Sequence, residues 1–356
     1  MTPMRTPLLL LLPLLAGCVV DQKWEEFELS RAPFANEWVE RGTANFEVLL
    51  AQGYICPDGL DARVYLVEPA TPASATEPRP LALLLHGRNF DRVELSGLHP
   101  FDEDRLSTEW ATNQVESLLG MESALGASAR GEGAWVAALL EQGFAVAVPA
   151  NCWGDLWHGR GDNDYEERFF RFGAYLASEA IQMASRRPGI SAETLLVVGM
   201  GEGGRGLMEL ITDGVQIDGA VVDSTPDWLS PWLAQSAVNH AEIDVLFAIY
   251  YAELQGIVEP AAKLNALRAL LERDSLVNAV LERGFRTPIL YAYSSLDQNV
   301  DLAFTQPAAD AIQVNYPPLD SRVLDWVVAD HAPSNRDPAQ ARTQLEWLLG
   351  RLGLLQ

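Results

Sequence analysis

Apolar residues in this chain form short continuous runs, and amphipathic stretches lie between the runs. The runs are too short for helices and are bounded by turn residues, so they predict strands, and those in the middle of the chain predict strands buried on both faces. The expected strands are 46–50, 62–68, 81–85, 144–148, 194–198, 219–223, 288–293 and 322–328. The main expected helices are 133–142, 165–187, 206–212, 308–315 and 338–352. This alternation indicates an α/β protein with a mostly parallel, eight-stranded sheet and helices on both faces.

Two long segments interrupt the alternation. Residues 88–130 form an acidic insertion with one helical stretch at 107–119. Residues 225–284 contain helical patterns at 260–271 and 275–283 but no strand pattern, so we expect a helical cap there.

The N-terminus has the features of an export signal. Arg5 precedes an apolar run at 8–15, which is too short to span a bilayer. The run ends in LAGC at 15–18, which resembles the lipobox of bacterial lipoproteins. This resemblance implies that residues 1–17 are removed and that Cys18 is acylated, with palmitate among the expected chains. Val19, and not aspartate, follows the cysteine, which by resemblance to the lipoprotein sorting rule of enteric bacteria favours the outer membrane of the cell envelope. Residues 18–43 are then a tether or N-terminal extension. The alternative is an ordinary secretory signal.

The charge and cysteine content of the chain limit the kinds of partner and bond that we expect. The formal net charge is −24 at pH 7, and the chain has no basic cluster, so we expect no binding to nucleic acid or to anionic lipid. With Cys18 acylated, Cys56 and Cys152 remain as an even pair in an oxidising compartment. No cysteine or histidine spacing is typical of a metal site, and we expect no cofactor.

The strand at 194–198 runs into a glycine-rich turn, GMGEGG at 199–204, and then into a helix. This turn resembles the nucleophile elbow of α/β-hydrolases, G-x-S-x-G, with Gly201 in place of the serine. The resemblance covers residues 44–354. It includes His86 after the third strand, Asp297 after the seventh and His331 after the eighth, and the exit of the sixth strand at 222–228 resembles dienelactone hydrolases and prolyl oligopeptidases.

The resemblance implies a role for each of these positions. Asp297 and His331 would be a retained acid and base, with no hydroxyl at residue 201 to activate. The backbone amides of Arg88 and Glu202 would form an oxyanion site. Glycine at 201 would relax a turn that costs a non-glycine residue about 1–3 kcal/mol.

Other residues near the same strand ends are candidates for binding or catalysis. Ser224, at the exit of the neighbouring strand, is the best substitute nucleophile. Four tryptophans follow the fourth and sixth strands and, with His86, either line a ligand cleft or pin the cap to the sheet. They are Trp153, Trp157, Trp228 and Trp232.

The strand order of the family also suggests a disulfide. That order begins 1-2-4-3, with strand 2 antiparallel to its neighbours, so the turn after strand 1 and the exit of strand 4 lie at one edge of the sheet. Cys56 lies in that turn and Cys152 follows that exit, so we expect the two to be bonded.

Three functions compete. The leading hypothesis is a lipid-anchored, non-catalytic or weakly catalytic protein that binds a small molecule or peptide. The second is an active esterase or peptidase-type hydrolase in which Ser224 is the relocated nucleophile. The third is a structural envelope protein without a ligand pocket.

Overall fold

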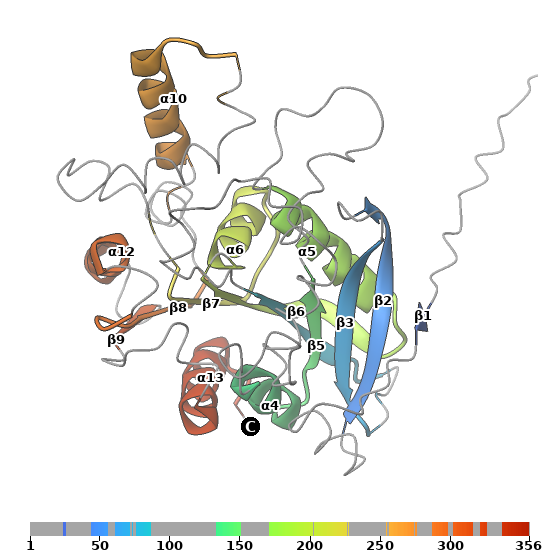
Figure 1. Ribbon diagram of the computed structural model, residues 1–356. Helices are drawn as coiled ribbons and strands as arrows, with labels where there is room; N and C mark the ends of the chain where they lie inside the picture. Colours follow the sequence, from blue (N-terminus) through green and yellow to red (C-terminus); the bar gives the residue numbers. More distant parts are fainter. Residues whose placement is uncertain are drawn as a thin grey trace, which may run out of the picture.

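The computed structural model describes residues 24–25, 44–55, 61–71, 73, 76–86, 133–150, 171–201, 203–225, 227, 254, 256–273, 275, 287–297, 302–315, 321–325 and 337–355. Their centre is a nine-stranded sheet with the order β1-β2-β3-β5-β4-β6-β7-β8-β9 (Figure 1). The strands are β1 (Trp24–Glu25), β2 (Ala44–Ile55), β3 (Asp61–Pro69), β4 (Arg79–Leu85), β5 (Ala145–Pro149), β6 (Ile190–Met200), β7 (Gly219–Asp223), β8 (Ile289–Tyr293) and β9 (Ser321–Asp325).

The sheet is mostly parallel, as predicted. Strands β4 to β9 pair in parallel, whereas β1, β2 and β3 pair antiparallel with their neighbours. The prediction of eight strands is wrong by one, because β1 lies in the segment expected to be a tether or N-terminal extension. It pairs with Val48 and Leu49 of β2 and so covers part of an otherwise free sheet edge. Two paired residues leave no periodic signal in a sequence.

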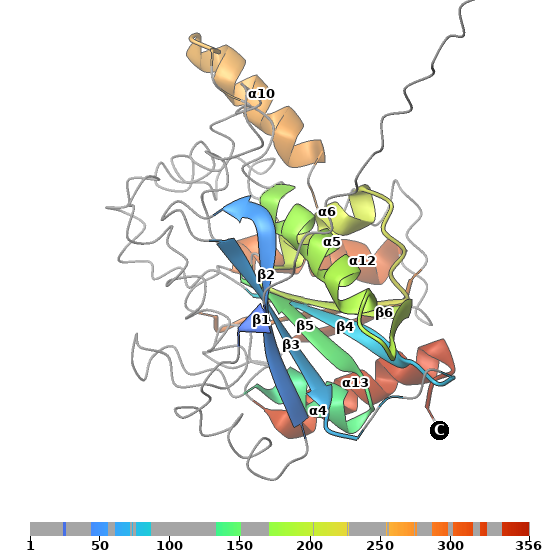
Figure 2. The same ribbon diagram turned by 90° about the vertical axis from the view of Figure 1, so that its right-hand side faces the viewer.

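Helices cover both faces of the sheet (Figures 1 and 2). One face carries α5 (Arg171–Ser185), α6 (Gly203–Thr212) and α12 (Leu302–Asn315), and the other carries α4 (Ala134–Glu141) and α13 (Pro338–Leu352). In both views α10 (Pro260–Arg273) lies apart from these layers. Its buried side chains, among those the structure describes, are Leu267 and Leu271. Among the described residues, no helix has the length and apolar character needed to cross a membrane.

Local sequence explains the best-defined elements. Strand β7 has its predicted bounds, and all five of its residues are buried. Helix α13 also has its predicted bounds: Asp337 caps it by accepting hydrogen bonds from the amides of Ala339 and Gln340, and Gly353 ends it in a left-handed conformation.

Several boundaries differ from the predictions. Strand β6 begins at Ile190, four residues earlier than expected, and α6 begins at Gly203. Helix α12 begins at Leu302 and runs through Pro307, although proline disfavours a helix interior. Its buried residues Phe304, Ala308 and Ile312 pack it onto the sheet and offset the missing backbone donor. The helices expected at 107–119 and beyond 275 lie outside the described residues, and so does most of the predicted cap.

Candidate functional site

Four of the predicted site residues follow neighbouring strands at the carboxyl edge of the sheet. His86 follows β4, Gly201 follows β6, Ser224 follows β7, and Asp297 lies four residues beyond β8. These four strands are adjacent and parallel, so their exits meet at one edge. The fold therefore brings these positions to one edge, as the sequence predicted.

Gly201 forms the sharp turn between β6 and α6. Its φ is +53°, in the left-handed region that favours glycine. Its amide donates a hydrogen bond to the carbonyl of Asp223 at 2.8 Å, and its own carbonyl accepts one from the amide of Gly204 at 3.2 Å. The turn is thus fixed on both sides and has the left-handed conformation expected at an elbow, although no side chain projects from it.

Gly203, the first residue of α6, lies directly against the end of β4. A Cβ atom here would overlap the carbonyl oxygen of Leu85 and would lie 2.8 Å from the carbonyl oxygen of His86. Any larger residue would push the helix away from the strand. The close docking of helix on strand therefore persists around a turn without a nucleophile.

Ser224 occupies a second left-handed turn beside the first. Its φ is +53°, and it is the only non-glycine residue with such a φ in the part of the chain that the structure describes. Its side chain is fully buried, and its Oγ donates to Oδ1 of Asp223 at 3.1 Å. Its amide donates to the carbonyl of Ala292 at 2.9 Å. This serine is therefore held against a carboxylate and has no exposed surface.

Asp297 lies in a tight turn after β8 that several hydrogen bonds hold in place. Its amide donates to the carbonyl of Ser294 at 3.2 Å, and Oγ of Ser294 accepts from the amide of Leu296 at 3.2 Å. The amide of Ser295 donates to Oδ1 of Asp325, the last residue of β9, at 2.9 Å. The neighbouring strand thus fixes the loop that carries the predicted acid.

A buried polar network around Asp227, four residues beyond β7, was not predicted. Asp227 Oδ2 accepts a hydrogen bond from Oγ of Ser275 at 3.2 Å, and the Asp227 amide donates to the carbonyl of Phe304 at 2.7 Å. Asp227 is 4% exposed and Ser275 is 2% exposed. Because these residues lie near the two ends of the predicted cap, the bond ties the start of that segment to the residues that follow α10.

Tyr291 extends this network within the sheet. Its hydroxyl donates to the carbonyl of Thr225 at 3.1 Å, and the carbonyl of Thr305 lies 3.3 Å away as a second acceptor for the same hydroxyl. Burial raises the pKa of Tyr291 well above 10, and the nearby Asp227 carboxylate raises it further. The hydroxyl therefore stays protonated and acts as a donor throughout the physiological range. The available sequence signal was an aspartate, Asp227, four residues beyond the end of the apolar strand at Asp223.

The remaining predicted residues lie outside the described part of the chain. They are Cys18, Cys56, Arg88, Cys152, Trp153, Trp157, Glu202, Trp228, Trp232 and His331. Among the described residues, no group of three His, Cys, Asp or Glu side chains is placed to hold a metal ion.

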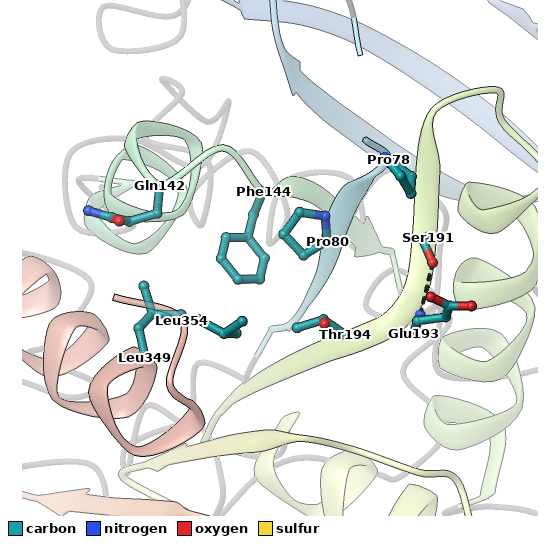
Figure 3. Close-up of a pocket in the computed structure, with 9 residues that line it drawn as sticks. All are labelled: Pro78, Pro80, Gln142, Phe144, Ser191, Glu193, Thr194, Leu349 and Leu354. Carbon is teal, nitrogen blue, oxygen red and sulfur yellow. Dashed lines mark hydrogen bonds between the residues drawn. The ribbon is translucent and has the colours of Figure 1, made fainter. Parts of the chain in front are cut away.

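A cavity of about 290 Å³ lies at the opposite, amino edge of the sheet (Figure 3). Three of its lining residues lie at the amino ends of central strands: Pro80 at the start of β4, Phe144 just before β5 and Thr194 near the start of β6. Leu354, which follows α13, lines it from the other side (Figure 3). The cavity is therefore separate from the edge that carries Gly201.

Comparison with known proteins supports the fold. No protein-family model and no curated protein sequence matches the chain. A structure named for a dipeptidyl aminopeptidase IV of Bacteroides ovatus is 13% identical to this chain in sequence and superposes with a TM-score of 0.52. The alignment covers 86% of this chain and 36% of that structure's chain. Dipeptidyl peptidase 4 of Porphyromonas gingivalis is 12% identical to this chain, with a TM-score of 0.50. The alignment covers 86% of this chain and 35% of the peptidase chain.

An esterase of Pyrococcus furiosus is also similar, with 11% identity, a TM-score of 0.47, and coverage of 88% of this chain and 94% of its own. The similarity to the two peptidase structures and the strand order of the sheet support the fold. The chain has the α/β-hydrolase fold, with one additional edge strand and with a glycine at the turn between β6 and α6.

Proposed function

We propose that this protein is a lipid-anchored α/β-hydrolase-like binding protein of the bacterial cell envelope, with little or no catalytic activity. The observation that carries this proposal is Gly201, which sits at φ +53° in a well-formed turn between β6 and α6. A nucleophile must project from that turn to reach a bound carbonyl group. Glycine provides the backbone conformation without the attacking atom.

The binding role rests on what surrounds this turn. Gly203 keeps α6 packed against the end of β4, so the backbone framework of an acyl-binding site is maintained. In this proposal the amides of Arg88 and Glu202 bind a carbonyl oxygen, and Asp297 orients His331 beside it. An oxyanion site without a nucleophile retains roughly 10³–10⁴-fold catalysis over water, so slow hydrolysis is compatible with the proposal. The ligand is a small molecule or peptide with an ester or amide carbonyl.

A relocated nucleophile at Ser224 is the alternative, and the geometry disfavours it. An attacking hydroxyl must reach the substrate, whereas the side chain of Ser224 is 0% exposed. Its hydroxyl already donates to the carboxylate of Asp223, the preceding residue. The burial and the hydrogen bond support a structural role for Ser224.

The lipid anchor is supported by LAGC at 15–18 alone and has its own test. In cells fed labelled palmitate, the wild-type protein should incorporate the label, and Cys18→Ala should not. Equal incorporation by both proteins would refute acylation at this cysteine.

Ester hydrolysis tests the binding role against catalysis. Purified wild type should hydrolyse p-nitrophenyl butyrate at or near the background rate, while acyl esters and peptides raise its unfolding temperature. Gly201→Ser should gain hydrolysis, and Gly201→Ser/His331→Ala should lose it. Robust wild-type turnover that Ser224→Ala abolishes would show that the nucleophile has moved to Ser224. A complete absence of ligand-induced stabilisation would favour a structural protein.

A further inference from the structure

The register of the sheet places β1 at the level of the candidate site. Trp24 pairs with Leu49, Leu49 pairs with Val64, and Val64 pairs with Pro149. These four residues form one row across four strands, and Pro149 is the last residue of β5. The row therefore lies at the carboxyl edge of the central strands.

The same row continues into the other half of the sheet. Leu83 of β4 pairs with Ala147, so two residues further along, Leu85 is level with the end of β5. Leu85 in turn pairs with Gly199, which lies two residues before Gly201. Trp24 is thus level with the start of the elbow. Five strand spacings separate β1 from β6, which at ~4.8 Å each is about 24 Å across the sheet.

The direction of β1 is equally informative. It runs antiparallel to β2, which is itself parallel to β5 through two antiparallel pairings. The chain therefore enters β1 at Trp24 from the side of the carboxyl edge and then runs toward the amino edge. Whatever is attached shortly before Trp24 is attached on the side of the candidate site.

The expected lipid attachment is close to this point. Six residue steps separate Cys18 from Trp24, and a fully extended chain advances at most ~3.5 Å per residue, or about 21 Å in total. This limit is comparable to the lateral distance between β1 and the elbow. A longer tether would allow any orientation, but one this short restricts which edge of the sheet reaches the membrane.

We propose that the lipid anchor holds the carboxyl edge of the sheet, and with it the candidate site, toward the membrane surface. The ligand is then an amphiphile that resides in the lipid, with its carbonyl group at the interface. This inference rests on the proposed function, because it takes the acylation of Cys18 and the location of the site from it. Net charge does not supply the attraction, since a chain of charge −24 is repelled by anionic lipid.

Energy transfer from the protein to the bilayer tests the orientation. Two exposed leucines provide matched reporters. Leu296 is 53% exposed and follows β8 at the carboxyl edge, and Leu355 is 49% exposed and follows Leu354, which lines the amino-edge cavity. Each is replaced by cysteine in the acylated protein, with Cys56→Ser and Cys152→Ser in both, and is labelled with the same donor dye. Acceptor-labelled headgroups are included in phosphatidylcholine vesicles. Matching unfolding temperatures establish that both proteins are folded.

We expect several-fold greater transfer from residue 296 than from residue 355, because β6 alone spans about 35 Å between the two edges. Inserting about 20 Gly/Ser residues after Val20 should remove most of the difference, because a flexible linker frees the orientation. Equal transfer from both positions with the natural tether, or greater transfer from residue 355, would overturn the proposed orientation. Failure of both proteins to bind vesicles would instead refute the anchor on which it rests.

A photoactivatable acyl ester dissolved in the same vesicles tests the ligand class. It should crosslink to the wild type in segments that follow the parallel strands. Crosslinks confined to the amino edge would overturn the proposal.

Discussion

The docking of α6 against β4 can be tested by adding a single methyl group. In Gly203→Ala, the new Cβ overlaps the carbonyl oxygen of Leu85 and approaches that of His86 to 2.8 Å. Gly203 does not have a left-handed φ, so alanine meets no backbone penalty there. The destabilising part of the effect therefore comes from overlap between the helix and the strand.

The expected loss of stability in Gly203→Ala lies at the upper end of the range observed when a packed site is overfilled. Extra methyl groups in a packed core cost about 1–3 kcal/mol, and the obstructing atoms here are backbone atoms of a strand in which Leu85 is fully buried. Alanine gains up to ~1 kcal/mol over glycine from helix propensity, and less at a helix start. We therefore expect Gly203→Ala to lower the free energy of unfolding by about 2–3 kcal/mol.

Gly214→Ala is the matched control. Gly214 follows α6 with φ +81°, and a Cβ there would meet no atom within 4 Å. Its substitution isolates backbone strain, about 1 kcal/mol, from steric overlap. Urea unfolding followed by tryptophan fluorescence measures both variants, and an unchanged m-value shows that the midpoint shift reports stability. If Gly203→Ala costs no more than Gly214→Ala, then α6 is not docked against β4 as described.

Three further outcomes are expected. Ser224→Ala should lower the free energy of unfolding by about 1–3 kcal/mol, because the buried Asp223 carboxylate loses the hydroxyl that donates to it. The same substitution in a Gly201→Ser background should leave the esterase activity unchanged. Loss of that activity would give Ser224 a catalytic role. Above about pH 10 the unfolded chain releases the proton of Tyr291 while the folded chain retains it, so this residue should lower the free energy of unfolding by about 1.4 kcal/mol per pH unit. In denaturant titrations at several pH values, the free energy of unfolding should fall less steeply with pH for Tyr291→Phe than for the wild type. Equal slopes would contradict the raised pKa of Tyr291. The exported, non-reduced protein should contain no titratable thiol if Cys56 and Cys152 are bonded, and two thiols would refute the pairing.

Much of the sheet was predictable because its central strands are short, apolar and bounded by turn residues. Strand β7 and helix α13 have the predicted bounds, since the strand is entirely buried and the helix carries caps at both ends. Strand β1 was not predictable, because two residues that pair with an edge strand have no local pattern. The continuation of α12 through Pro307 depends on packing against the sheet, which local propensity does not contain.

The candidate site was predictable only where it depends on backbone. The order of strand exits placed Gly201, Ser224 and Asp297 at one edge, and the structure has them there. The burial of Ser224 and the hydrogen bond between Asp227 and Ser275, 48 residues apart, are consequences of tertiary packing. Sequence periodicity carries no information about such long-range pairs.

Covalent labelling by a fluorophosphonate shows whether the protein has an activated nucleophile, because the probe reacts only with such a group. Wild type and Gly201→Ser are incubated with the probe, and mass spectrometry of the peptides identifies the labelled residue. We expect no label on the wild type, label at residue 201 in Gly201→Ser, and loss of that label in Gly201→Ser/His331→Ala. Stoichiometric labelling of the wild type at any residue would contradict the claim that this hydrolase fold lacks a nucleophile.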